Sequence, residues 1–191
     1  MEGTAKKPSY LGLLNAIALG EGRAHQYLSC WAAKTPDADV KKVIATVAIR
    51  EGEHSHAFTK RLCELGFTVQ DRPDPQFEKN MAIANADCSD LEKFEALGFG
   101  GEGRNSRDPF KGVFDDESID IKTGELLGRY VAEERDSGRM LRACADILRQ
   151  RAGGTRRGSA GTSELRDLHS RLDEICAAIG KLQTEVTALR R

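Results

Sequence analysis

Three long segments of this chain repeat apolar residues at the spacing of an α-helix, and no other feature constrains the fold as much. The segments cover residues 9–33, 36–65 and 118–151. Because a helix turns once every 3.6 residues, such a repeat places the apolar residues on one face. In the first segment that face carries Tyr10, Leu14, Ile17, Ala24, Leu28 and Trp31. The sequence therefore predicts an all-α protein.

Capping signals set the ends of the second helix. Thr35 followed by Pro36 is typical of a helix start, with Thr35 as the N-cap and Pro36 at the first helical position. Gly66 predicts its end. The connection to the first helix is therefore short, and we expect the two helices to pack antiparallel.

A less regular helical stretch is expected over residues 76–97. Ser89 and Glu92 have the spacing of a capping box, which predicts a break near Cys88. The glycine-rich segment 98–112 follows. It lacks the GK[ST] ending of a phosphate loop and follows no predicted strand, so we interpret it as a surface loop and not a nucleotide site.

Composition excludes several classes of protein. The chain has 191 residues, a net charge of −1 and 39% hydrophobic residues, enough for a sizeable core. No stretch approaches the roughly 18 uncharged residues of a membrane span, and the N-terminus lacks the apolar centre of a signal peptide. The five cysteines are scattered without a CxxC pair. We expect a cytoplasmic protein with reduced thiols, Cys30 and Cys63 lying in the core, and no nucleic-acid partner.

The C-terminal part differs from the rest. Residues 151–162 form a linker rich in glycine and arginine, so the chain should divide into a helical bundle (1–150), this linker, and a last helix (163–191). That helix repeats apolar residues at alternating spacings of three and four, typical of a coiled coil. The repeat is Leu165, Leu168, Leu172, Ile175, Ile179, Leu182, Val186 and Leu189.

This repeat predicts self-association. The β-branched residues Ile179 and Val186 fall at position a and leucine dominates position d, which favours a parallel homodimer. The alternatives are a helix that folds back onto the bundle and a coiled coil formed with another protein.

The second helix contains two overlapping Glu-x-x-His pairs in the stretch REGEHSHAF. Glu51 and His54 fall in the middle of the apolar face, whereas Glu53 and His56 fall well off it. A buried acid and imidazole are costly unless they are paired or bind a ligand. The inward face carries Val40, Ile44, Val47, Phe58, Leu62 and Leu65. We expect Glu51 and His54 to point inward and the other pair to point to solvent.

The other two long helices also carry a glutamate on the apolar face. Glu21 lies near the middle of the first helix, and Glu134 and Ser137 interrupt the face of the last. Glu133 lies just beside this face and Asp136 points away. Carboxylates with imidazole suit iron or manganese, and helical bundles use such ligands in two-metal sites.

The stretches GEGRAHQYLSCWA (20–32) and VIATVAIREGEH (43–54) resemble the first half of the rubrerythrin and ferritin-like superfamily. That resemblance implies a four-helix bundle with a di-iron or di-manganese centre. The family takes a glutamate from its first and third helices and a Glu-x-x-His pair from its second and fourth. Carried onto this sequence, the metal ligands would be Glu21, Glu51, His54, Glu95 and Glu134.

The chain departs from the family pattern in its second half. Ser137 stands where the family has a histidine after Glu134, and serine is a poor iron ligand. Glu92 and Glu95 form the only Glu-x-x-Glu pair in the third helical stretch, near its end. The absence of CxxC pairs means that the iron–sulfur domain of true rubrerythrins is missing.

Two functions follow from these patterns. The first is a ferritin-like metal protein that acts in oxygen, peroxide or iron oxidation chemistry. Such a protein would be a di-metal oxidoreductase. The second is a metal-free bundle that works as an oligomeric interaction module, its acids paired with Arg50, Arg135 or His25. Tyr27 and Tyr130 should lie near the site as core aromatics.

Overall fold

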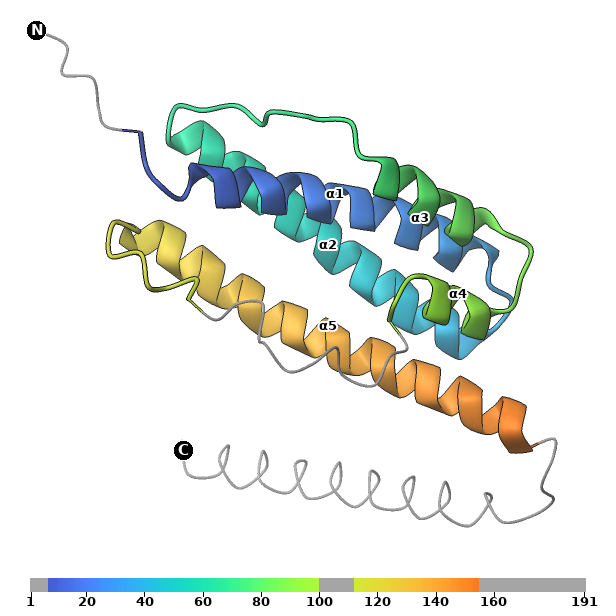
Figure 1. Ribbon diagram of the computed structural model, residues 1–191. Helices are drawn as coiled ribbons and strands as arrows, with labels where there is room; N and C mark the ends of the chain where they lie inside the picture. Colours follow the sequence, from blue (N-terminus) through green and yellow to red (C-terminus); the bar gives the residue numbers. More distant parts are fainter. Residues whose placement is uncertain (1–6, 100–111, 155–191) are drawn as a thin grey trace, which may run out of the picture. The chain divides into compact units, whose positions relative to one another are not determined.

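The computed structural model describes residues 7–99 and 112–154. Every regular element in these two ranges is a helix, which confirms the all-α prediction (Figure 1). The described helices are α1 (Leu11–Lys34), α2 (Ala38–Glu64), α3 (Pro75–Asn85), α4 (Asp90–Ala96) and α5 (Ile121–Gly154).

The helices α1 and α2 form an antiparallel hairpin (Figure 1). The N-cap of α2 is Asp37, whose carboxylate accepts from the backbone of Asp39 and Val40, so the predicted cap at Thr35 was wrong. Thr35 still closes α1, because its backbone N–H donates to the carbonyl of Trp31 at 3.0 Å. Because Thr35 is the C-cap of α1, the N-cap of α2 falls two residues later, at Asp37. The end of α2 was placed correctly, since Gly66 follows it with a φ of 84°.

The third helical stretch is divided, as the capping box predicted. α3 ends at Asn85 and α4 begins at Asp90, with the Ser89 and Glu92 side chains bonded to each other's backbone. Asp90 ties α4 to the hairpin, because it accepts hydrogen bonds from Trp31 Nε1 and Thr35 Oγ1, both at 2.6 Å. The expected break near Cys88 is therefore confirmed, and it leaves two short helices.

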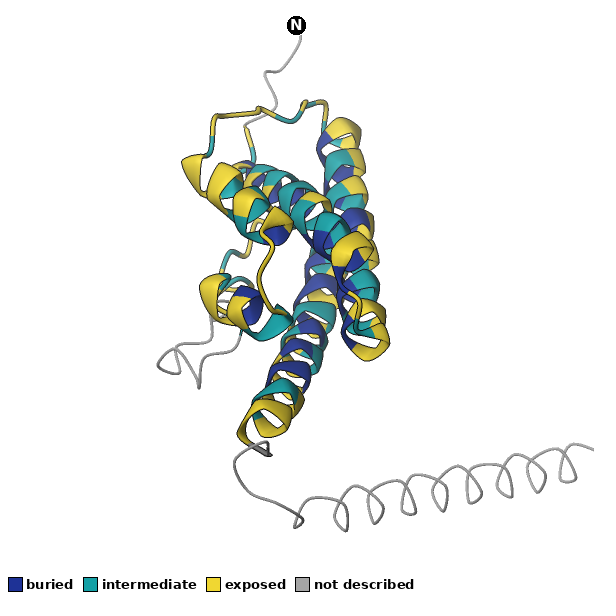
Figure 2. Cartoon of the chain, turned by 90° about the vertical axis from the view of Figure 1, so that its right-hand side faces the viewer, coloured by how far each residue is buried: buried dark blue, intermediate teal, exposed yellow. Residues whose placement is uncertain are grey.

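The core has two parts along α5, and Figure 2 shows the buried residues gathered on the facing sides of the helices. One part joins all five helices around Trp31 and Phe94, and the other joins α1, α2 and α5 around Phe58. Cys144 is buried, but the prediction for Cys63 was wrong: it is exposed, and Cys30 is only half-buried. Both fall outside the buried faces of their helices.

A charged network fixes the start of α5 against the hairpin. The buried Arg61 guanidinium donates to Thr123 Oγ1 and to Asp120 Oδ1, both at 2.8 Å. It also pairs with Glu64 at 2.9 Å. Tyr10 donates to the second Asp120 oxygen at 2.7 Å. We call these five residues the Arg61 network; it sets the register of α5 against α1 and α2.

Several predictions lie outside the described residues, among them the coiled coil of 165–189 and most of the glycine-rich loop 98–112. The predicted linker is described only at its start, where α5 continues to Gly154. None of the described helices combines the length and the apolar character that a membrane span requires.

Candidate metal centre

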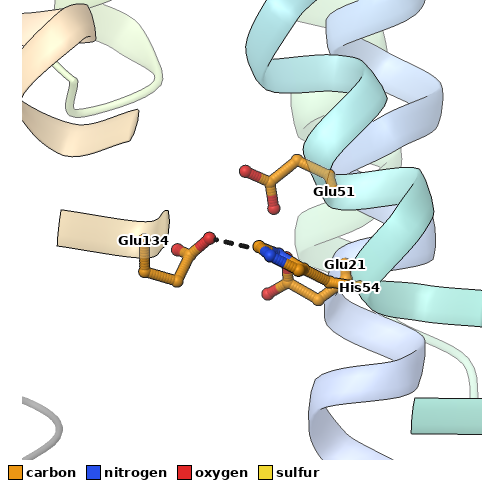
Figure 3. A group of neighbouring side chains, drawn as sticks. All are labelled: Glu21, Glu51, His54 and Glu134. Atoms are coloured by element: carbon orange, nitrogen blue, oxygen red, sulfur yellow. Dashed lines mark hydrogen bonds and ion pairs between the residues drawn. The ribbon is translucent and has the colours of Figure 1, made fainter. Parts of the chain in front are cut away.

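Four of the five predicted ligands meet inside the molecule. Glu21 comes from α1, Glu51 and His54 come from α2, and Glu134 comes from α5 (Figure 3). Each offers one ligand atom, and these atoms all lie within 4.8 Å of one another. We call these four residues the acid–histidine cluster.

The phase of the apolar face separated the two Glu-x-x-His pairs correctly. Glu51 and His54 are 6% and 3% exposed, whereas Glu53 and His56 lie on the exposed side of α2. Glu95 is exposed on α4 and is not among the residues that meet in the cluster. Because α4 is a separate short helix, its acid has no continuous third helix to bring it to the level of the other ligands.

Small residues let α1 and α2 approach closely at the level of the cluster. A Cβ on Gly22 would lie 2.9 Å from Ser55 Oγ, and a Cβ on Gly52 would lie 2.9 Å from His25 Nδ1. Both contacts are closer than real Cβ atoms make. These two glycines flank Glu21 and Glu51 in sequence, so the close crossing brings the acids of the two helices to one place.

The two ring nitrogens of His54 have different partners. Nδ1 faces the cluster, 3.3 Å from Glu21 Oε2 and 3.5 Å from Glu134 Oε1 (Figure 3). Nε2 is held by Glu133 Oε2 at 2.7 Å. Burial alone would lower the pKa of His54, but its bonds to these three acids raise that pKa to about 10. The imidazole is therefore protonated at neutral pH when no ion is bound.

Glu133 is the residue that sequence reasoning left out of the site. It is half-buried beside the cluster, and its second oxygen accepts from Arg129 Nε at 2.9 Å. Arg129 is also 3.7 Å from Glu53, so this chain of charges leads from His54 to the surface. The available signal was its place at the edge of the apolar face, next to Glu134.

The acids of the cluster differ in protonation. Burial, the hydrogen bond with Glu21 and the charges of Glu21 and Glu134 raise the pKa of Glu51 to about 11. Burial would also raise the pKa of Glu21, but hydrogen bonds from His54, Glu51 and Tyr130 lower it below its ordinary value. At neutral pH Glu51 thus carries a proton that it shares with Glu21.

Two tyrosines border the cluster, as expected. Tyr130 donates to Glu21 Oε1 at 3.0 Å, and its ring packs edge-on against His54 and Phe58. Burial and the neighbouring acids raise the pKa of both Tyr27 and Tyr130. Both phenols are therefore neutral, and Tyr130 can donate a hydrogen bond to the cluster.

One acceptor of the cluster is not satisfied. Glu134 Oε1 is buried and is the single buried side-chain nitrogen or oxygen of the described residues that has no hydrogen-bond partner. An unsatisfied buried carboxylate oxygen costs free energy. This oxygen faces His54 Nδ1 at 3.5 Å as an ion pair, without a hydrogen bond (Figure 3). A cation bound between the carboxylates would supply the missing contact, so the donors of this site fit a metal ion.

Two of the basic residues expected to neutralise the acids, Arg50 and His25, have hydrogen-bond partners outside the cluster. Arg50 donates to Asp136 Oδ2 at 2.7 Å and to Ser137 Oγ at 3.3 Å. His25 Nδ1 lies 2.6 Å from the carbonyl oxygen of Ala48. Arg135 lies on the exposed side of α5. His54 itself is a cation that pairs with Glu21 and Glu134 of the cluster.

No protein-family model matches this chain, and comparisons with curated proteins and with solved structures found no match. The fold and the site define an all-helical protein with a buried carboxylate–histidine cluster. The ferritin-like relationship stays a prediction, and the function has to be argued from the contacts described above.

Proposed function

We propose that this chain is a ferritin-like protein that binds iron or manganese at the acid–histidine cluster. The observation that carries the proposal is the buried oxygen of Glu134 that has no hydrogen-bond partner, although it lies 3.5 Å from the His54 imidazole and among two further carboxylates. Three carboxylates and one imidazole form a donor set that suits iron or manganese better than it suits metal ions that prefer sulfur ligands. Their residues come from three helices, so the fold holds the donors in place without an ion.

Each residue has a distinct task in this proposal. Glu21, Glu51 and Glu134 supply oxygen donors, and His54 supplies Nδ1, the nitrogen that faces them. Glu133 keeps Nε2–H in a hydrogen bond, which fixes the ring orientation. Binding displaces the protons that Glu51 and His54 hold at neutral pH, so affinity should rise with pH. A bound iron would supply oxygen, peroxide or iron oxidation chemistry.

Metal analysis tests the proposal. The chain is purified without chelator, stripped, and titrated with Fe(II) under anaerobic conditions and with Mn(II), alongside Glu51→Ala. We expect stoichiometric binding that the substitution abolishes. The control is Glu53→Ala, which removes an exposed acid two residues away. If the wild type retains no ion, or if both variants bind like it, the cluster is not a metal site.

A second function is supported by the bonds within the cluster. His54 already links α1, α2 and α5 through Glu21 and Glu133, so the bundle is held together without an ion. In this alternative the chain is a metal-free scaffold that works as an oligomeric interaction module. An unchanged unfolding temperature after addition of Fe(II) or Mn(II) would favour it, because an ion that binds only the folded state must raise that temperature.

We further propose that the chain forms a homodimer through residues 165–189. The support is the uninterrupted heptad repeat of that segment. Sedimentation equilibrium of the full chain and of a chain ending at Gly154 tests this. The full chain should have the mass of a dimer, and the shorter chain should have the mass of a monomer. Equal association of both chains would show that the repeat does not drive assembly.

A further inference from the structure

Arg50 places a positive charge beside the cluster. It precedes Glu51 in α2, and its guanidinium crosses to α5, where Nη1 donates to Asp136 at 2.7 Å and to Ser137 at 3.3 Å. Ser137 is only 2% exposed and lies one turn beyond Glu134 on the same side of α5. The guanidinium thus reaches the interior face of α5 directly next to the last ligand of the cluster.

The charge of this guanidinium lies close to the ligands of the cluster. Arg50 precedes Glu51 in the chain, and its hydrogen bond to Ser137 at 3.3 Å holds the guanidinium one turn of α5 from Glu134. Any cation that bound on the Ser137 side of Glu51 would meet the guanidinium, whose side chain is 27% exposed, in a partly buried setting. Like charges repel more strongly in such a setting than in water.

The donors that meet in the cluster form one compact group. One ligand atom from each of the four residues lies within 4.8 Å of the others, which suits one shared ion. A second ion would need donors from the next turn of α5. There the structure offers the hydroxyl of Ser137, a poor ligand for iron or manganese, and this hydroxyl already accepts from Arg50.

We infer that the cluster holds one metal ion per chain, because Arg50 and Ser137 occupy the position where a second ion would have to bind. This inference rests on the proposed metal binding and departs from the two-metal centre that the ferritin-like resemblance implies. Arg50 is a specificity-determining residue: it sets the number of ions and does not ligate one.

Stoichiometry of Mn(II) binding tests the inference on the full chain. Bound ions are counted by equilibrium dialysis with elemental analysis, and their spacing is read from the electron paramagnetic resonance spectrum. We expect one ion per chain with the spectrum of an isolated Mn(II). Two ions with an exchange-coupled spectrum would overturn the inference and leave metal binding intact. No bound ion would overturn the proposed function itself, so the two failures are distinguishable.

A double substitution tests the role assigned to Arg50. Arg50→Met with Ser137→His removes the positive charge and adds an imidazole on the same turn, and we expect the bound Mn(II) to double and the spectrum to become coupled. The matched control is Arg139→Met, which removes a cation that pairs with the same Asp136 at 3.0 Å from the exposed side. It should keep one ion. If the double variant folds, by its helical circular dichroism and unfolding temperature, and still binds one ion, Arg50 does not set the number.

Discussion

The protein buries two charged networks that are built differently. In the Arg61 network, one guanidinium faces two acids, and Tyr10 and Thr123 donate to the same Asp120 carboxylate. In the acid–histidine cluster, three acids and the adjacent Glu133 surround a single imidazole. The first network provides one cation for two acids, while the second provides one imidazole for four acids.

The pKa values express this difference. Burial alone would raise the pKa of Asp120, but hydrogen bonds from Thr123, Tyr10 and Arg61 hold that pKa well below its ordinary value. The pKa of Glu51 is instead raised to about 11. A network that favours its ionised acid stabilises the fold, whereas a site that must protonate an acid costs stability. Such a cost is typical of functional sites.

The largest effect is expected from breaking the Arg61 network. Arg61→Ala leaves Asp120 and Glu64 without their guanidinium, and removing one partner of a largely buried ion pair should lower the free energy of unfolding by about 3 kcal/mol. Urea denaturation measures it. The control Lys60→Ala, at a 78% exposed side chain that also faces Glu64, should change stability by less than about 0.5 kcal/mol. Equal effects of the two substitutions would contradict a structural role for Arg61.

An increase in stability is expected from removing the ionisable group of Glu51. Glu51→Gln keeps the shape of the protonated acid and needs no proton, so it should stabilise the metal-free protein by about 2 kcal/mol at pH 7.5 while abolishing Mn(II) binding. Thermal and urea unfolding measure the gain. A loss of stability together with retained binding would show that Glu51 is an ordinary structural acid.

The pH dependence of this gain follows from the raised pKa. The unfolded chain releases the Glu51 proton above its ordinary pKa of 4.5, and the folded chain holds it to about 11. The contribution of Glu51 to stability is therefore complete below pH 4.5 and declines as pH rises toward 11. The difference between Glu51→Gln and the wild type should grow from pH 5 to pH 8. A constant difference would mean that Glu51 is ionised in the folded protein.

A smaller effect is expected from the residue that holds the far side of His54. Glu133→Gln should weaken Mn(II) binding by about 10-fold, because the ring loses the carboxylate that fixes Nε2. Isothermal titration calorimetry measures the affinity. Glu53→Gln removes the same charge from the other partner of Arg129 and should leave the affinity within about 2-fold. If both weaken binding equally, the effect is general electrostatics and not positioning.

The smallest effect concerns acid stability at the Arg61 network. Because the folded-state pKa of Asp120 is lowered, its contribution to stability is present above about pH 4 and is lost as pH falls below that value. The Asp120 side chain is 38% exposed, and after allowing for screening by solvent we expect about 1 kcal/mol. The loss between pH 5 and pH 3 should be smaller in Asp120→Asn. An identical decline in both proteins would assign acid unfolding to other groups.

Helical periodicity located most of the site before any tertiary structure was considered. The phase of α2 is a local property, because side chains one turn apart share a face whatever packs against it. It correctly placed Glu51 and His54 inside and Glu53 and His56 outside. The same reasoning applied to Glu21 and Glu134, which lie in the middle of long apolar faces.

Periodicity was less informative where helices are short or a residue lies at the edge of a face. The third helical stretch was recognised as broken, yet its sequence did not show that Glu95 would remain exposed on α4. Glu133 lies beside the apolar face of α5, and a position at the edge becomes interior or exposed according to the distance of the neighbouring helix. Only the packing of α2 against α5 gave it His54 as a partner.

The sequence by itself determined that the chain is helical and which acids point inward, because both follow from the order of residues within one helix. The tertiary structure decided which charges meet. Arg50 could have neutralised Glu51, its neighbour in sequence, yet its long side chain reaches Asp136 and Ser137 on α5. Electrostatic partners depend on distances between helices, and no single helix encodes such distances; the close approach of α1 and α2 at Gly22 and Gly52 is one example.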